Sequence, residues 1–184
     1  MKPKDGIENV DIGQAIITRS LVRAIRQHYE LPWHGIHGIG HWARVLENGL
    51  RLAPLTGADE QVVALFAVFH DSQRINESID PEHGRRGAEL AAHLRGREFK
   101  LSDDQFDLLQ TACILHADGL TEADVTVQTC WDADRLDLWR VGMWPDPRKL
   151  CTAAAKDRNI IAWSQGRSVG GQVPEFVRKQ WKAG

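Results

Sequence analysis

The stretch Val62-Val63-Ala64-Leu65-Phe66-Ala67-Val68-Phe69-His70-Asp71 decides how this chain folds. Everything before His70 in it is apolar, so the segment is expected to lie in the interior of the protein. It ends in a histidine and a carboxylate, and burying an ionised carboxylate is costly unless a cation or strong hydrogen-bond donors meet it. A bound divalent metal ion is the simplest such partner. The sequence therefore predicts a buried helix that carries metal ligands at its end.

Length and composition favour one soluble domain. The chain has 184 residues, of which 42% are hydrophobic, and this suffices for a single domain over residues 1–184 with a sizeable core. The formal net charge of −2 gives no electrostatic reason to expect nucleic acid or an anionic membrane as a partner. The cysteines form no Cys-x-x-Cys unit, which argues against a disulfide framework and a zinc ribbon. Without a predicted signal peptide or membrane span, we expect a cytoplasmic protein. The sequence is compatible with a monomer and with a homo-oligomer.

Apolar residues recur at helical spacing through nearly the whole chain, beginning with the stripe Ile12, Ile16, Ile17, Leu21 and Ile25. No alternating strand pattern interrupts them. The pattern predicts an all-α bundle of about seven helices. The expected helices cover about residues 12–29, 38–53, 60–70, 80–94, 102–116 and 124–141, with short helical stretches near 150–156 and 160–163 and a glycine-rich link over 166–171.

Local signals set several of the expected helix ends. Pro54 is expected to stop the helix that begins near residue 38. Asp80-Pro81-Glu82 has the pattern of an N-cap followed by the first helical residues. Ser102-Asp103-Asp104-Gln105 is a capping-box signature, and Asp124 closes a similar capping sequence.

Histidines and carboxylates follow one another along three of these helices. His41 opens an apolar helical face, His70-Asp71 ends the buried segment, and Asp134 lies in Asp132-Ala133-Asp134-Arg135-Leu136-Asp137. Helical bundles build interior metal sites in this way, from side chains that converge from facing helices. Mixed nitrogen and oxygen ligands suit Mn, Fe, Co, Ni or Zn better than Mg or Ca.

The ordered set His, His-Asp, Asp resembles the HD-domain superfamily of metal-dependent phosphohydrolases, an all-α family. The resemblance covers about residues 36–141 and rests on His41-Trp42-Ala43-Arg44-Val45, on the His70-Asp71 doublet and on Ala133-Asp134-Arg135-Leu136. It implies an HD-like core over 36–141, followed by a packing extension over 148–184, and His41, His70, Asp71 and Asp134 as metal ligands. Asp132 and Asp137 compete for the last place. The stretches near 69–84, 131–138 and 145–147 look like those of a small bacterial subgroup.

His83 and His116 extend the implied site. Both fit the binuclear branch of the superfamily, in which two further histidines bind a second metal ion and the doublet aspartate, here Asp71, bridges the two ions. The resemblance thus implies one or two ions. A bound divalent metal lowers the pKa of a water molecule and polarises a phosphoryl oxygen, so hydrolysis needs no protein nucleophile.

Other residues are expected to bind or activate the substrate. His37 lies one helical turn before His41 and is expected to orient a phosphate, hold a water molecule or cap the helix. Arg74 and Arg44 each follow a predicted ligand by one turn, and guanidinium groups pair well with phosphate oxygens. Arg85, Arg86 and Arg135 are weaker candidates for the same role.

The sequence departs from several nucleotidases of this superfamily, which place a glutamate shortly after the doublet. Here the residues are Ser72-Gln73-Arg74, and the nearest acid is Glu77. This leaves His37, His116 and Glu77 as alternatives for the general acid. The leading hypothesis is a metal-dependent hydrolase of a small phosphorylated molecule: a phosphomonoester, a nucleotide or a cyclic nucleotide. A diiron oxygenase of the same superfamily and a non-catalytic nucleotide-sensing module are the alternatives.

Overall fold

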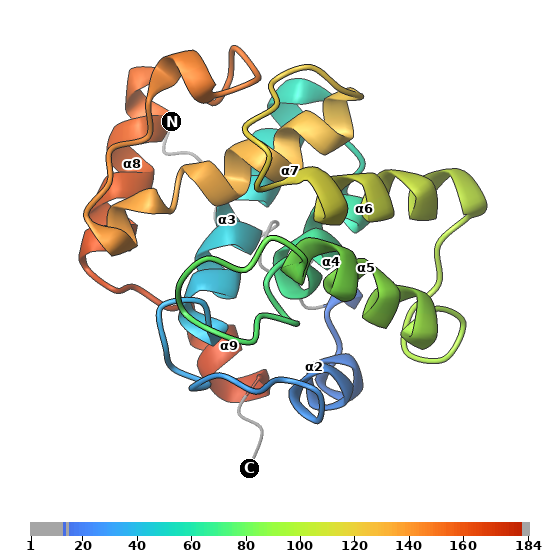
Figure 1. Ribbon diagram of the computed structural model, residues 1–184. Coiled ribbons are helices and arrows are strands. Elements are labelled where there is room, and N and C mark those ends of the chain that lie inside the picture. Colours follow the sequence, from blue (N-terminus) through green and yellow to red (C-terminus); the bar gives the residue numbers. More distant parts are fainter. Residues whose placement is uncertain (1–12, 14, 182–184) are drawn as a thin grey trace.

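The computed structural model describes residue 13 and residues 15–181. Their α-helices are α2 (Arg19–Arg26), α3 (Ile39–Thr56), α4 (Glu60–Phe69), α5 (His83–Leu94), α6 (Asp103–Leu115), α7 (Val125–Arg135), α8 (Arg158–Val169) and α9 (Glu175–Gln180). Two short 3-10 helices, η1 (Leu138–Val141) and η2 (Pro147–Lys149), follow α7 (Figure 1). No strand occurs in the described part of the chain, and the predicted all-α bundle is confirmed.

Helix α4 lies at the centre of the bundle. It packs against α3, α5, α6 and α7, and every residue from Val62 to Phe69 is buried. Asp59 caps its start by accepting hydrogen bonds from the amides of Gln61 and Val62. The predicted burial of this segment is confirmed, and the His70-Asp71 doublet emerges from it where the neighbouring helices converge.

Three close helix contacts depend on glycine. A Cβ atom at Gly49 of α3 would clash with the side chain of Val63. One at Gly84 of α5 would clash with the carbonyl oxygen of Cys113 in α6, and one at Gly87 with that of Phe69. Gly49 lets α3 approach α4, and Gly84 and Gly87 let α5 approach α6 and the end of α4. Side chains at these helix ends can therefore share one site.

Helix α3 continues past the residue that was expected to stop it. Pro54 lies inside the helix, which ends at Gly57 with a left-handed φ of 80°. A proline in the last turn removes one amide donor, and this costs less there than in the middle of a helix. The hydroxyl of Thr56 donates to the carbonyl oxygens of Leu52 and Ala53 and so stabilises the same turn.

Two predicted helices differ near their starts. The first is interrupted: residues 13, 15 and 16 are helical, but Thr18 adopts an extended conformation and its side chain accepts the amide of Leu21, so α2 begins at Arg19. Ile12 lies outside the described residues. Helix α5 begins at His83, because the Asp80 carboxylate accepts from the amide of Ile75 and from Arg86 instead of capping the helix. The capping box at Ser102 and the cap at Asp124 are confirmed.

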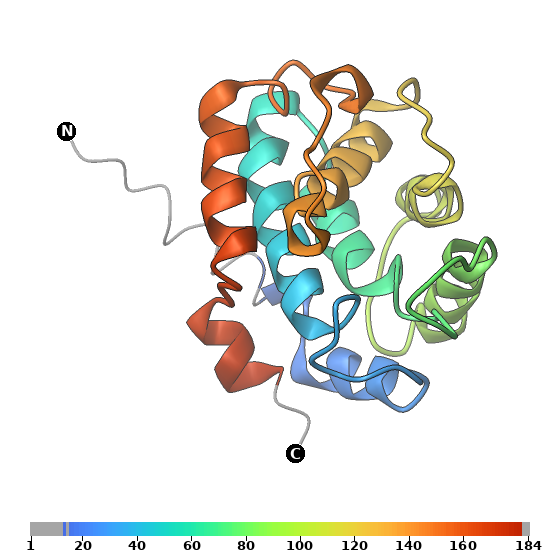
Figure 2. The same ribbon diagram turned by 60° about the vertical axis from the view of Figure 1, so that its left-hand side comes forward.

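The C-terminal extension is more helical than predicted. Helix α8 begins after the cap residue Asp157 and runs through Gly166, which was expected to open a link. Its residues Ile160, Ser164 and Ser168 recur every four positions and are buried. The stretch over 150–156 is not a helix, whereas α9 was not predicted. Figure 2 shows α8 alongside α3, and α9 below it at the end of the bundle.

The described residues contain no helix that combines the length and apolarity needed to cross a membrane. Cys113, Cys130 and Cys151 are all free thiols, as expected from their spacing.

Candidate metal centre

The first group of ligand atoms joins α3 to the end of α4. Nε2 of His41 lies 3.0 Å from Nε2 of His70. Oδ2 of Asp71 lies 3.5 Å from the first of these nitrogens and 3.6 Å from the second. An ion that binds ligands at about 2.0–2.2 Å separates neighbouring ligand atoms by roughly 2.9–3.5 Å. The three side chains therefore have the spacing of a metal site.

Asp134, at the end of α7, approaches the same two nitrogens. Its Oδ1 atom lies 3.3 Å from Nε2 of His41 and 3.8 Å from Nε2 of His70. The side chain is 17% exposed, against 4% for Asp71, so Asp134 lies on the solvent side of the group. Asp134 falls outside the set whose ligand atoms all lie within 4.8 Å of one another. It reaches the site predicted for it, at its edge.

A second group of ligand atoms shares Asp71 with the first. Nε2 of His83 lies 2.8 Å from Nε2 of His116. Oδ1 of Asp71 lies 3.2 Å from the nitrogen of His83 and 3.7 Å from that of His116. The two oxygens of one carboxylate thus face two different pairs of histidines. This is the arrangement expected of a carboxylate that bridges two ions.

The hydrogen bonds of the four histidines turn the same ring atom toward the centre. Nδ1 of His41 contacts Oδ2 of Asp137 at 2.8 Å, and Nδ1 of His70 contacts the carbonyl oxygen of Phe66 at 3.1 Å. The remaining two rings contact carbonyl oxygens in the same way, His83 that of Asp80 and His116 that of Cys113. A carbonyl oxygen accepts only from a protonated nitrogen, so in their neutral form the rings of His70, His83 and His116 keep the Nε2 lone pair toward the centre, where a metal could bind.

The charges of the cluster also favour a cation. Burial lowers the pKa of His70 to about 3, so this ring is neutral and able to bind a metal at neutral pH. Burial and Arg140 lower the pKa of His41, but Asp134, Asp137 and Asp71 raise it to about 9, so without a metal this ring carries a proton between the carboxylates. Burial would raise the pKa of Asp71, but the surrounding histidines, His70, His116, His41 and His83, hold it well below its usual value. The pKa of Asp134 is held down mainly by His41 and His70 against the effect of burial. Two ionised carboxylates thus lie among imidazole rings, and this donor set fits a transition-metal ion.

Arg74 places a positive charge beside the second group. Its Nη1 atom lies 3.4 Å from Oδ1 of Asp71 and 3.2 Å from Nε2 of His83. The same guanidinium donates to the carbonyl oxygens of Asn76 and Ser78, which fix it in place. This charge opposes a divalent ion at the second group, so we expect the first group to bind metal more tightly.

Asp137 connects His41 to a buried arginine. Its carboxylate accepts Nε of Arg44 at 2.7 Å and Nη2 at 3.0 Å, besides contacting Nδ1 of His41. Arg44 was predicted to bind substrate, but two of its donors are directed to Asp137. Arg140 lies on the other side of the same carboxylate, with Nη1 4.0 Å from Oδ2. Sequence reasoning missed Arg140, although its position three residues after Asp137 was a usable signal.

His37 lies at the edge of the cluster. Its ring is paired with Glu77, and its centroid is 6.4 Å from that of the His41 ring. Burial lowers the pKa of His37, although Asp71 and the hydrogen bond to Glu77 act in the opposite direction. The loop after the doublet thus brings two of the expected general acids together, while the third, His116, lies within the second group of ligands.

The alternative metal ligand Asp132 and the weaker candidates for phosphate binding have structural roles. Asp132 accepts the amides of Cys151 and Thr152 and the Thr152 hydroxyl, so it anchors the chain after η2. Arg135 donates to backbone carbonyl oxygens at Lys149 and Leu120. Arg86 is paired with Asp80, and Arg85 forms exposed ion pairs with Glu82 and Glu89.

Comparison of the chain with family models, with curated proteins and with solved structures found no match. The HD-domain resemblance therefore remains an expectation from the motifs themselves.

Proposed function

We propose that this protein is a metal-dependent hydrolase of a small phosphorylated substrate. One observation carries the proposal: the two oxygens of the buried Asp71 carboxylate face separate pairs of histidine nitrogens. Such a costly arrangement of buried polar groups is typical of functional sites. The ordered motifs that resemble the HD-domain superfamily support the same activity.

The chain's own residues would divide the work between them. His41, His70 and Asp71 would hold the first ion, with Asp134 at its solvent side, and Asp71, His83 and His116 would hold a second one. When bound, the metal supplies an activated water molecule and a Lewis acid for the phosphoryl group. Arg74 is fixed beside Asp71 and would pair with a phosphate oxygen.

The pair of His37 and Glu77 would handle protons at the edge of the site. Burial lowers the pKa of the His37 ring, so at neutral pH the ring is largely unprotonated and able to accept a proton. Through its hydrogen bond Glu77 fixes the orientation of this ring. We infer that His37 positions the substrate or a water molecule, and that Glu77 orients it for this role.

The test is release of inorganic phosphate from a panel of phosphomonoesters, nucleotides and cyclic nucleotides. Protein stripped with a chelator is reloaded with Mn, Fe, Co, Ni or Zn, and Asp71→Asn is compared with His93→Ala, an exposed histidine that serves as control. We expect turnover in the wild type and in His93→Ala, and its loss in Asp71→Asn and in chelated protein. Equal turnover in Asp71→Asn would contradict the proposal.

The four histidines also favour a second candidate, the diiron oxygenase. Two pairs of histidine nitrogens that share one carboxylate could bind two iron ions as well as the two divalent ions of a hydrolase. Two irons per chain with a mixed-valence signal in electron paramagnetic resonance, together with no phosphate release for any metal, would favour the oxygenase.

A further inference from the structure

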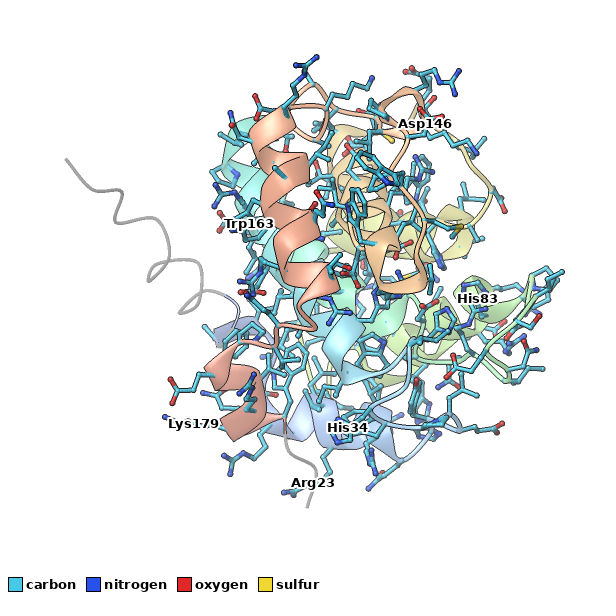
Figure 3. All side chains as sticks on the ribbon, turned by 90° about the vertical axis from the view of Figure 1, so that its left-hand side faces the viewer. Arg23, His34, His83, Asp146, Trp163 and Lys179 are labelled. Carbon is cyan, nitrogen blue, oxygen red and sulfur yellow. The ribbon has the colours of Figure 1, made fainter. Side chains whose placement is uncertain are left out.

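A cavity of about 810 Å³ is bordered by Arg44 and by the metal-ligand candidate His41. Its walls come from the loop before α3, from the start of α3, from η1 and the end of α8, and from α9 with the segment that leads to it. In Figure 3, His34 of that loop and Lys179 of α9 lie at the lower end of the molecule, whereas His83 lies toward the right, on α5. A cavity of this size matches the usual volume of small-molecule sites, about 300–1,000 Å³.

The cavity combines an apolar wall with positive charge. Its apolar side chains are Trp33, Ile36, Ile39, Val173, Val177 and Trp181. Arg44, Arg140 and Arg178 also line it, and none of its described lining residues carries a carboxylate. Asp137 forms ion pairs with the first two arginines, at 2.7 Å to Nε of Arg44 and 4.0 Å to Nη1 of Arg140. The guanidinium of the third, Arg178, makes no hydrogen bond or salt bridge with the described residues. The wall therefore carries an excess of positive charge.

The cavity adjoins the metal centre and shares one residue with it. Of the predicted metal ligands only His41 lines it, and Nε2 of that ring faces His70 and Asp71. The remaining metal ligands, and His37 with its partner Glu77, are not part of its described wall. A ligand in this cavity would therefore bind beside the metal centre and not between its ligand atoms.

We propose that this cavity binds a small amphipathic organic anion, an alkyl or aryl body that carries a carboxylate, phosphate or sulfonate group. The apolar body would lie against the tryptophan, isoleucine and valine side chains. Its anionic group would pair with Arg140 and Arg178. The site does not depend on the proposed hydrolase activity.

The test is isothermal titration calorimetry with 1-octanesulfonate, which no hydrolase can turn over, and with 1-octanol as the neutral probe of the same chain length. We expect one sulfonate per chain, bound about tenfold or more tightly than the alcohol. Arg178→Gln is expected to weaken the sulfonate about threefold to tenfold, and Arg178→Glu further. Arg97→Gln, at an exposed arginine after α5, is the matched control and is expected to change nothing.

Two further variants test whether the sulfonate binds in this cavity and independently of the metal. Val173→Trp fills the cavity from a half-buried position and is expected to abolish saturable binding, while circular dichroism confirms that the variant is folded. Asp71→Asn is expected to lose metal but to bind the sulfonate as the wild type does. Equal binding of octanol, unchanged binding in Val173→Trp, or loss of binding in Asp71→Asn would each overturn the proposal. These titrations need no turnover, so the proposed hydrolase can fail its own test without affecting them.

Discussion

Replacing Asp137 by asparagine tests whether the hydrogen bonds behind the ligands matter for metal binding. The carboxylate is 1% exposed and meets Nδ1 of His41 and two donors of Arg44 at 2.7–3.0 Å. Asparagine keeps the shape but removes the charge, and its amide nitrogen would face one of these donors. Loss of the hydrogen-bond partner of a metal ligand typically weakens metal binding about 10–100-fold, or about 1.4–2.7 kcal/mol. Breaking a buried ion pair also costs about 3–5 kcal/mol of stability.

Asp132 provides a matched control for this variant. It is also fully buried and accepts three hydrogen bonds, from the amides of Cys151 and Thr152 and from the Thr152 hydroxyl, but it contacts no metal ligand. Asp132→Asn is therefore expected to lower stability while leaving metal affinity unchanged. The measurements are urea unfolding and competition for metal with a chromogenic chelator. If both variants bind metal equally well, the reasoning about Asp137 is refuted.

Three more predictions address the second group and the loop before it. Arg74→Gln removes the guanidinium that opposes a divalent ion, so metal analysis is expected to find more of the second ion bound; unchanged stoichiometry would contradict this. Gly84→Ala forces α5 away from α6, so it is expected to lower the free energy of unfolding in urea by about 1–3 kcal/mol and to abolish binding of the second ion. Gly166→Ala, with open space around the added methyl group, is the tolerated control. Asp80→Asn is expected to lower the unfolding midpoint at pH 7. Burial opposes ionisation of Asp80, but Arg86 and the Ile75 amide hold its pKa below the usual value, so its contribution is present above pH of about 4 and is lost as the pH falls through the lowered pKa. A difference between wild type and Asp80→Asn that did not decrease as the pH fell below about 4 would refute this.

The sequence predicted those parts of the fold that depend on local chemistry. The apolar run before His70 is buried because nothing in it can face water, and the caps at Ser102 and Asp124 form because their side chains reach nearby amides. The prediction of a cap at Asp80 failed because other groups bind its carboxylate. Asp80 had the pattern of a cap, but Arg86 and the Ile75 amide bind its carboxylate instead.

The arrangement of the candidate site was only partly predictable. The ligand types and their order along the chain indicated a metal centre, yet the sharing of Asp71 between two histidine pairs depends on how α5 and α6 pack. That packing follows from the small size of Gly84 and Gly87, which local patterns do not reveal. Arg44 reaches Asp137 through a tertiary contact, so no local signal showed that Arg44 would be held by a carboxylate, whereas the contact of Arg140 three residues after Asp137 is local.

The most direct test of the account is anomalous X-ray diffraction from crystals grown with zinc or manganese, recorded on both sides of the metal's absorption edge. We predict a strong peak about 2.0–2.2 Å from Nε2 of His41, Nε2 of His70 and Oδ2 of Asp71. A weaker peak is expected between Oδ1 of Asp71 and the nitrogens of His83 and His116. Crystals that contain the metal but show no anomalous peak between these side chains would contradict the account.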